Sequence, residues 1–249
     1  MKLVLLHSPL VGTGTWRAIA PALEARGFEV AVPDFAADMA GPPPYYSRLV
    51  RTATACVARD SAILVAHSGA GSLVPAIVAS GRVSGAIFVD ALMPHPGQSW
   101  FETVPQTFKT RLENLARNDH VPPWHRWWPE GAIRSLFADE ASYVQFALEL
   151  KEIPLAYLEE PAPDRDLGGD FAGAYLQLGP GNAAEASAAE RLGLPVKRLA
   201  LHHLALVYEA ASAARRARAA VRRVRLEGCR VMAVGNLTVG GVLARYVNG

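Results

Sequence analysis

Short apolar runs alternate along the chain with segments in which apolar residues recur at helical spacing. Four runs in the first 90 residues are aliphatic and too short for most helices, which is typical of buried strands. They span residues 2–6, 28–33, 62–66 and 83–89. Strands that alternate with helices favour an α/β fold, with a mostly parallel, doubly wound sheet that carries helices on both faces.

The segments between these strands predict helices. Apolar side chains in residues 15–26 recur at roughly helical spacing, and Gly27 follows at a usual position for a helix end. A second helix is expected over residues 45–59, and a third directly after Ser68. Each would cover one face of the sheet between two parallel strands.

The pattern changes between residues 91 and 170, where no run predicts a strand of the parallel sheet. Helices are expected there over residues 100–117, 131–137 and 140–150, and residues 159–170 are typical of a linker because they are rich in proline and charge. Helices inserted at this point should form a lid over the carboxyl ends of the strands.

Aromatic residues are frequent in this insert. Most are expected to form an ordinary core between helices, and a subset that faces the sheet would line a pocket for an apolar or aromatic substrate. The candidates for that pocket are Trp100, Trp124, Trp127, Trp128 and Tyr157.

After the insert, strands are predicted over residues 174–178 and 195–201, and helices over residues 183–192 and 204–218. Three units are expected. Residues 1–90 and 171–220 form the sheet core, residues 91–170 form a helical lid with its linker, and residues 221–249 form a basic, glycine-rich C-terminal tail of unclear structure.

The composition narrows the possible classes of function. The chain has 249 residues, of which 51% are hydrophobic, and its formal net charge of +2 predicts no general attraction to nucleic acid. No apolar run reaches transmembrane length, and the N-terminal run is too short for a signal peptide. We therefore expect a cytoplasmic protein, monomeric or homodimeric, that acts on a small molecule away from membranes. The frequent Ala and Arg residues favour a bacterial source.

Cysteine and histidine spacings predict neither a disulfide framework nor a metal site. Cys56 and Cys229 lie far apart, which fits a reducing compartment. His95, His120 and His125 match no metal-binding motif. No glycine-rich stretch matches a phosphate-binding loop either, so we expect no metal and no cofactor.

The most informative stretch joins the third predicted strand to its helix. Residues 66–70 read AHSGA, which puts Ser68 at the tip of a tight strand–turn–helix connection. Such an elbow exposes a nucleophilic serine, and its sharp turn needs small residues on either side. Ala66 and Ala70 stand where the G-x-S-x-G pattern has glycine, and they keep those positions small. On this motif alone, Ser68 is equally a candidate for capping the helix.

Polar side chains follow several of the predicted strands. His7 and Ser8 follow the first strand, Ser68 the third, Asp90 the fourth and His203 the last. Active sites of open α/β sheets lie at the carboxyl ends of the strands, where such residues meet.

Three stretches in order resemble the α/β-hydrolase superfamily over about residues 1–220, in particular its small esterase and hydroxynitrile-lyase-like branch. Residues 3–16, LVLLHSPLVGTGTW, are similar to the opening V-L-V-H-G-x-x-x-G-x-x-W. The elbow at Ser68 follows, and residues 203–209, HLALVYE, are similar to the ending H-x-x-M-L-x-x. The combination favours Ser68 as a nucleophile rather than a cap.

The resemblance implies a Ser-His-acid triad. A serine hydroxyl needs a base within hydrogen-bond reach to attack a carbonyl, and His203 is the expected base, preferred over its neighbour His202. His67, directly before the serine, is expected to pack beneath the elbow in a structural role.

The resemblance also implies an oxyanion hole for the tetrahedral intermediate. The backbone N–H of Gly69 is one expected donor, and the second should come from the loop after the first strand. Because Pro9 has no N–H, the backbone N–H of Ser8 or Leu10 is the candidate.

The acid of the triad is the least determined member. Relatives usually carry it after the strand that is predicted to end at residue 178, but residues 179–182 read GPGN. Asp90 is therefore the expected acid, with Glu159 and Glu160 as reserves, and Asp34 is expected to be structural.

Three functions remain open at this point. The favoured one is a serine hydrolase, esterase- or thioesterase-like, for an acyl substrate with an apolar or aromatic part. The alternative is a cofactor-free lyase or cyclase, for example on a polyketide-like intermediate, that uses Ser68 and His203 as acid and base. A ligand-binding protein without activity is the third, and fold alone does not choose among them.

Overall fold

The computed structural model describes residues 2–57, 61–80, 82–168 and 171–205. Its centre is a six-stranded sheet in which every neighbouring pair of strands is parallel. In sheet order the strands are β2 (Glu29–Ala31), β1 (Lys2–Leu6), β3 (Ala62–His67), β4 (Val83–Val89), β7 (Gly173–Gln177) and β8 (Val196–Arg198). The α/β fold expected from the sequence is thereby confirmed.

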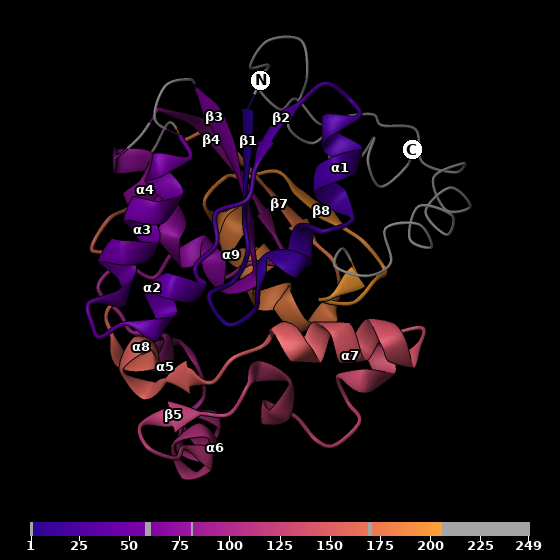
Figure 1. Cartoon of the computed structure of the whole chain (residues 1–249). Helices are drawn as coiled ribbons and strands as arrows, with labels where there is room; N and C mark the ends of the chain where they lie inside the picture. The colour runs from indigo at the N-terminus through magenta and orange to yellow at the C-terminus, as the bar shows by residue number, and fades with distance from the viewer. Residues whose placement is uncertain (1, 58–60, 81, 169–170, 206–249) are drawn as a thin grey trace.

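Helices cover both faces of this sheet (Figure 1). Leu3 and Leu5 of β1 pack on the same side as α1 (Ile19–Glu24), whereas Val4 and Leu6 belong to the cluster that contains the helices of the other side. Those helices are α3 (Tyr45–Ala55), α4 (Val74–Ser80) and α9 (Ala183–Arg191). Because successive side chains of a strand point to opposite faces, strands buried on both sides read as continuous apolar runs.

The segment between β4 and β7 lies beyond the carboxyl ends of the strands, at the lower end of Figure 1. It contains α5 (Trp100–Thr103), α6 (Gln106–Leu115), α7 (Glu140–Glu149) and α8 (Leu155–Glu159), together with the short antiparallel pair β5 (His120–Val121) and β6 (Ile153–Pro154). Short 3₁₀ turns and one further helix complete the described elements, namely η1 (Thr13–Trp16), α2 (Ala36–Ala40), η2 (Ser68–Leu73), η3 (Trp124–Trp127), η4 (Arg134–Leu136) and η5 (Pro180–Asn182).

Prolines explain where the helices differ from the sequence-based expectation. The helix predicted over residues 15–26 is divided into η1 and α1, and Pro21 lies in the first turn of α1, where its missing N–H is tolerated. The helix predicted over residues 100–117 is divided at Pro105 into α5 and α6. The helix predicted over residues 131–137 is only a 3₁₀ turn.

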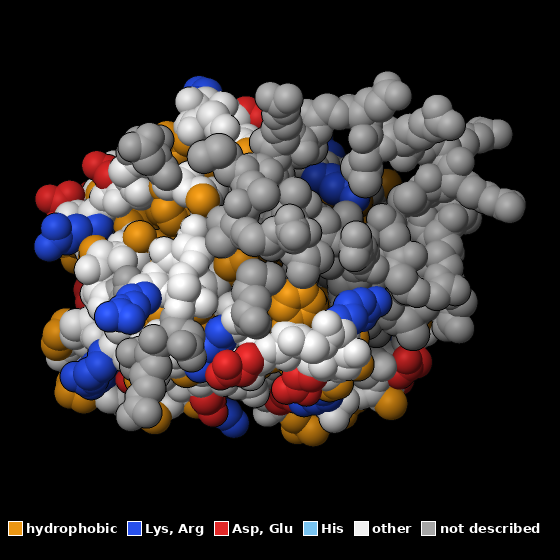
Figure 2. All heavy atoms as spheres, turned by 90° about the horizontal axis from the view of Figure 1, so that it is seen from above, with side chains coloured by type: hydrophobic (Ala, Val, Ile, Leu, Met, Phe, Trp, Pro, Cys, Tyr) orange, Lys and Arg blue, Asp and Glu red, His pale blue; other side chains and the backbone are white. Residues whose placement is uncertain are grey.

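Acidic and basic side chains are interspersed on the face seen in Figure 2, where the described surface is visible. Among the described residues, no helix is long and apolar enough to cross a membrane. The predicted tail of residues 221–249 and most of the predicted helix 204–218 lie outside the described residues.

The elbow after β3 packs tightly against the loop that follows β4. The Leu92 N–H donates to the Ser68 carbonyl over 3.0 Å, and a Cβ added at Gly71 would lie 1.9 Å from the Leu92 carbonyl oxygen. Only glycine allows the backbones to approach this closely, so Gly71 fixes the spacing between the two strand ends.

We expect Gly71→Ala to lower the free energy of unfolding by about 1–3 kcal/mol, since the added methyl group overpacks a backbone contact. Gly181→Ala is the matched control, because a Cβ there meets no atom of the described residues within 4 Å, and it should change stability by less than about 0.5 kcal/mol. Urea unfolding of both variants measures the difference. Equal stabilities would contradict the tight elbow.

Candidate active site

Ser68 stands at the carboxyl end of β3 in a conformation that few residues adopt. Its φ is 56°, in the left-handed region, and the chain turns there directly into η2. Ala66 and Ala70 are fully buried on either side of the turn. The helix expected directly after Ser68 begins as this 3₁₀ turn and continues as α4. The elbow presents the Ser68 side chain at the edge where the strands end.

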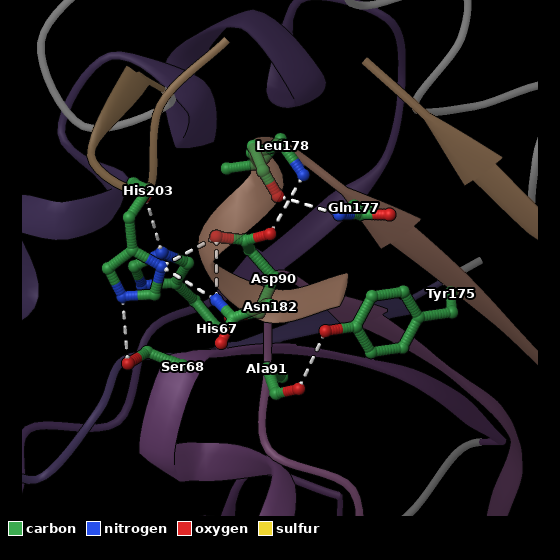
Figure 3. Close-up of polar contacts among 10 residues, drawn as sticks. His67, Ser68, Asp90, Ala91, Tyr175, Gln177, Leu178, Asn182 and His203 are labelled. Carbon is green, nitrogen blue, oxygen red and sulfur yellow. Dashed lines mark hydrogen bonds and ion pairs between the residues drawn. The ribbon is translucent and has the colours of Figure 1, made fainter. Parts of the chain in front are cut away.

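His203 bridges Ser68 and Asp90 (Figure 3). Its Nε2 lies 3.0 Å from Ser68 Oγ, and its Nδ1 lies 2.7 Å from Asp90 Oδ2. Since a carboxylate only accepts, Nδ1 carries the proton and donates to Asp90, and Nε2 accepts from the Ser68 hydroxyl. The side chain of His203 is 26% exposed and that of Asp90 is 2% exposed, so solvent reaches the histidine more easily than the acid.

Asp90 is held by groups from β7 and from the segment directly after it. The Leu178 N–H donates to Asp90 Oδ1 over 2.9 Å, and the Asn182 side-chain amide donates to Oδ2 over 2.8 Å. The same amide donates to the Asp90 carbonyl over 3.0 Å, and the Asp90 N–H donates to the Leu176 carbonyl over 2.7 Å. A φ of 45° at Asp90 turns the chain out of β4, and aspartate tolerates this conformation better than most residues.

Opposing effects act on the pKa of Asp90. Burial raises it, but the hydrogen bond and charge of His203 lower it, and the donors of Leu178 and Asn182 act in the same direction. The net pKa lies below the ordinary value for aspartate. The carboxyl group is therefore ionised at neutral pH despite being buried.

His67 contacts both the ring and the backbone of His203. Its ring stacks on the His203 ring with 4.7 Å between centroids, and its Nε2–H donates to the His203 carbonyl over 3.0 Å. Burial, followed by the charge of His203, lowers the pKa of His67 to about 3. A neutral ring thus supports both the backbone and the imidazole of His203, a more specific role than packing beneath the elbow.

The loop after β1 lies beside the elbow. His7 Nδ1–H donates to the Ser8 carbonyl over 2.8 Å, and the Val11 N–H donates to the same oxygen over 3.0 Å. The Leu10 N–H donates to Ser8 Oγ over 3.3 Å. A Cβ added at Gly69 would lie 2.8 Å from Ser8 Oγ, so the residues expected around an oxyanion hole adjoin one another.

The other acids considered from the sequence have different partners. Glu160 accepts from the backbone N–H groups of Tyr45 and Tyr46 at the start of α3, over 2.6 and 2.9 Å. Glu159 is exposed. Asp34 is exposed and accepts from the Ala36 N–H over 2.9 Å. Of the four acids, Asp90 alone is hydrogen-bonded to His203 among the described contacts.

The five aromatic residues expected in the pocket occupy different surroundings. Trp124 lies near the site, with 6.2 Å between its ring centroid and that of His203. Trp127 is fully buried and donates to the Pro122 carbonyl. Trp100 packs on Trp127, Trp128 packs on Trp124, and Tyr157 packs between Tyr45 and Tyr46. Trp124 therefore has the most direct geometric relation to the site.

Asn182 and His67 are functional candidates that sequence reasoning missed or understated. Asn182 occupies the loop where an acid was sought, and its amide supports Asp90 instead. The sequence held one indication of this role, namely the position of Asn182 directly after a strand. When the triad acid stands at the end of another strand, as Asp90 does, a side-chain amide here can donate a hydrogen bond to it. In the part of the chain that the structure describes, no group of His, Cys, Asp and Glu residues could hold a metal ion.

No protein-family model matches the sequence, and no curated protein matches it significantly. Solved structures do match. An extracellular α/β-hydrolase from a Paenibacillus species has a TM-score of 0.65 at 20% identity, covering 82% of this chain and 91% of that chain. The chain has the α/β-hydrolase fold.

Two further structures with this fold bear different names. A pyrethroid hydrolase from Sphingobium faniae JZ-2 has a TM-score of 0.63 at 16% identity, covering 89% of this chain and 96% of that chain. A variant of tomato methylketone synthase I, in complex with β-ketoheptanoate, has a TM-score of 0.56 at 17% identity, covering 82% and 91%. The α/β-hydrolase fold thus hosts more than one chemistry, and the reaction must be argued from the residues of this site.

The buried His67 predicts a pH dependence of stability. The unfolded chain binds a proton at His67 near the ordinary pKa of 6.5, whereas the folded chain binds it only near pH 3. Stability is therefore lost as the pH falls below 6.5, by up to about 1.4 kcal/mol per pH unit from this residue. His67→Gln keeps an N–H for the His203 carbonyl and does not titrate.

We expect the unfolding free energy of the wild type to fall more steeply between pH 6.5 and pH 4.5 than that of His67→Gln. Urea unfolding across this range measures the two slopes, and the buried His7 contributes equally to both proteins. Parallel slopes would contradict a buried neutral His67.

Proposed function

We propose that this protein is a serine hydrolase that cleaves carboxylic esters through Ser68, His203 and Asp90. The observation that carries the proposal is the position of His203, with Nε2 3.0 Å from Ser68 Oγ and Nδ1 2.7 Å from Asp90 Oδ2. Each ring nitrogen has the partner that a triad requires, and Ser68 has the backbone strain of an elbow. The hydrolases that share this fold support the reaction class.

The first half of the reaction would proceed by attack of Ser68 Oγ on the ester carbonyl. His203 Nε2 takes the hydroxyl proton as the new C–O bond forms, and the carbonyl electron pair moves onto oxygen. Asp90 remains ionised and stabilises the imidazolium through Nδ1–H. His203 then gives the proton to the departing alcohol, which leaves an acyl group on Ser68.

The second half would use water in the same way. His203 removes a proton from water as it attacks the acyl carbon, and then returns the proton to Ser68 Oγ as the acid product leaves. In both halves the intermediate carries negative charge on the former carbonyl oxygen. The Gly69 N–H, in the first turn of η2, is the proposed backbone donor to that oxygen.

The proposed substrate is an ester whose acyl or alcohol part is apolar or aromatic. Trp124 supports this choice because its ring centroid lies 6.2 Å from that of His203. Aromatic and aliphatic walls with few polar groups are typical of such binding sites.

A lyase or cyclase that uses Ser68 and His203 as acid and base is the second candidate. The altered loop after β1, with Ser8 and Pro9, favours the lyase or cyclase because an acyl-transfer enzyme of this fold normally takes a backbone oxyanion donor from this loop. The methylketone synthase of the same fold supports the idea that its chemistry varies. Covalent capture of Ser68 distinguishes the candidates, since only the hydrolase needs an acylated serine.

A fluorophosphonate probe and p-nitrophenyl butyrate test the proposal together. We expect the probe to label Ser68 in the wild type, and no labelling in Ser68→Ala. The rate of ester hydrolysis should fall about a thousandfold or more in both His203→Ala and Asp90→Asn. In Asp90→Asn the cause is that the asparagine stabilises the wrong tautomer of His203.

Asp34→Asn is the matched control, since Asp34 also follows a strand and its carboxylate accepts, among the described hydrogen bonds, only from the nearby Ala36 N–H. It should keep kcat within about twofold of the wild type. An unlabelled, folded wild type that does not hydrolyse the ester would refute the hydrolase. Full activity in Asp90→Asn would refute the acid.

A further inference from the structure

The three residues after Ser8 offer no free backbone N–H to an oxyanion hole. Pro9 has no N–H. The Leu10 N–H is already bonded to Ser8 Oγ, and the Val11 N–H to the Ser8 carbonyl, over 3.3 and 3.0 Å. The loop is locked in this arrangement by His7, whose Nδ1–H donates to the Ser8 carbonyl while Nε2 accepts from the Phe35 N–H. Within the loop, the remaining candidates for the second donor are the backbone N–H and the hydroxyl of Ser8.

The Ser8 hydroxyl is buried, and among the described contacts it donates no hydrogen bond. The residue is 1% exposed, and its Oγ accepts the Leu10 N–H. Within the part of the chain that the structure describes, the hydroxyl proton takes part in no hydrogen bond. A buried hydroxyl whose proton has no acceptor destabilises the fold, unless another molecule provides an acceptor.

The same hydroxyl adjoins the proposed backbone donor. The atom nearest to a Cβ built on Gly69 is Ser8 Oγ, at 2.8 Å. The Gly69 N–H lies in the first turn of η2, where helical N–H groups have no partner within the helix, and no acceptor for it lies among the described residues. Two unused donors thus border the same place beside Ser68.

We propose that the Ser8 hydroxyl is the second oxyanion donor and replaces the backbone N–H that Pro9 lacks. This assignment rests on the proposed hydrolase function. As Ser68 attacks, the carbonyl π electrons move onto oxygen, and Ser8 donates a hydrogen bond to that oxygen without transferring its proton. The Leu10 N–H polarises the hydroxyl and strengthens it as a donor.

Ser8→Ala tests this assignment because it removes the hydroxyl and keeps the Ser8 backbone N–H. With p-nitrophenyl butyrate we expect kcat to fall about a hundredfold or more, with KM within about threefold, as for the loss of one oxyanion donor. Ser8→Thr retains a hydroxyl and should recover kcat to within about tenfold of the wild type.

A transition-state analogue separates a catalytic hydroxyl from a structural one. Ser68 Oγ adds to the carbonyl carbon of a trifluoromethyl ketone with a butyl chain. The resulting hemiketal carries an oxyanion at the position that the oxyanion of the tetrahedral intermediate would occupy. Its inhibition constant should rise in Ser8→Ala by about the factor by which kcat falls, because both depend on the same hydrogen bond. A loop that had merely shifted would raise KM as well.

Ser72→Ala is the matched control, since Ser72 is a buried serine that donates to the Gly69 carbonyl over 2.9 Å. It should keep kcat within about fivefold. Thermal unfolding checks each variant, and Ser8→Cys, a weaker donor of similar shape, replaces Ser8→Ala if the latter does not fold; it should also lower kcat.

The outcomes are distinct. Suppose that the wild type is active and labelled at Ser68, and that Ser8→Ala keeps the wild-type kcat and inhibition constant. This result would overturn the assignment of the Ser8 hydroxyl and make the Ser8 backbone N–H the second oxyanion donor. A wild type that neither hydrolyses the ester nor takes the probe would overturn the hydrolase, and the Ser8 assignment with it.

Discussion

The buried carboxylate of Asp90 is the constraint on which the rest of the site depends. A charged group that is 2% exposed is stable only when every oxygen has donors, and here they come from Leu178, Asn182 and His203. These residues lie about 90 to 110 positions further along the chain. Satisfying the carboxylate therefore draws the end of β4, the end of β7 and the loop after β8 to one point, and it aims His203 Nε2 at Ser68.

Parallel pairing makes this convergence possible. Because β3, β4 and β7 run in the same direction, Ser68, Asp90 and Leu178 emerge at one edge of the sheet, while small residues let the chains approach. Gly71 touches the Leu92 carbonyl, and Gly69 faces Ser8. His67, neutral and buried, fixes the position of His203 by stacking on its ring and donating a hydrogen bond to its carbonyl. The geometry of the site is thus a product of backbone spacing as much as of the three polar side chains.

Much of this was predictable from the sequence, because the strands of a sheet buried on both faces are short aliphatic runs. The bounds of β1 and β4 follow directly, and the order of motifs gave Ser68, His203 and Asp90 as candidates. The divided helices around Pro21 and Pro105 were not anticipated, since their apolar spacing continues across the prolines. The role of Asn182 depends on a contact between distant segments, which local pattern does not encode. The lid and the aromatic pocket remain predictions.

A crystal structure of the wild-type protein after reaction with a fluorophosphonate tests whether Ser68, His203 and Asp90 form the active site. We expect a phosphonyl group on Ser68 Oγ, with its unesterified oxygen about 2.7–3.1 Å from both the Gly69 nitrogen and Ser8 Oγ. His203 should remain between Ser68 and Asp90 with its Nδ1 bonded to the carboxylate. An adduct on another residue, or a phosphonyl oxygen directed away from Gly69, would contradict the assignment of this site.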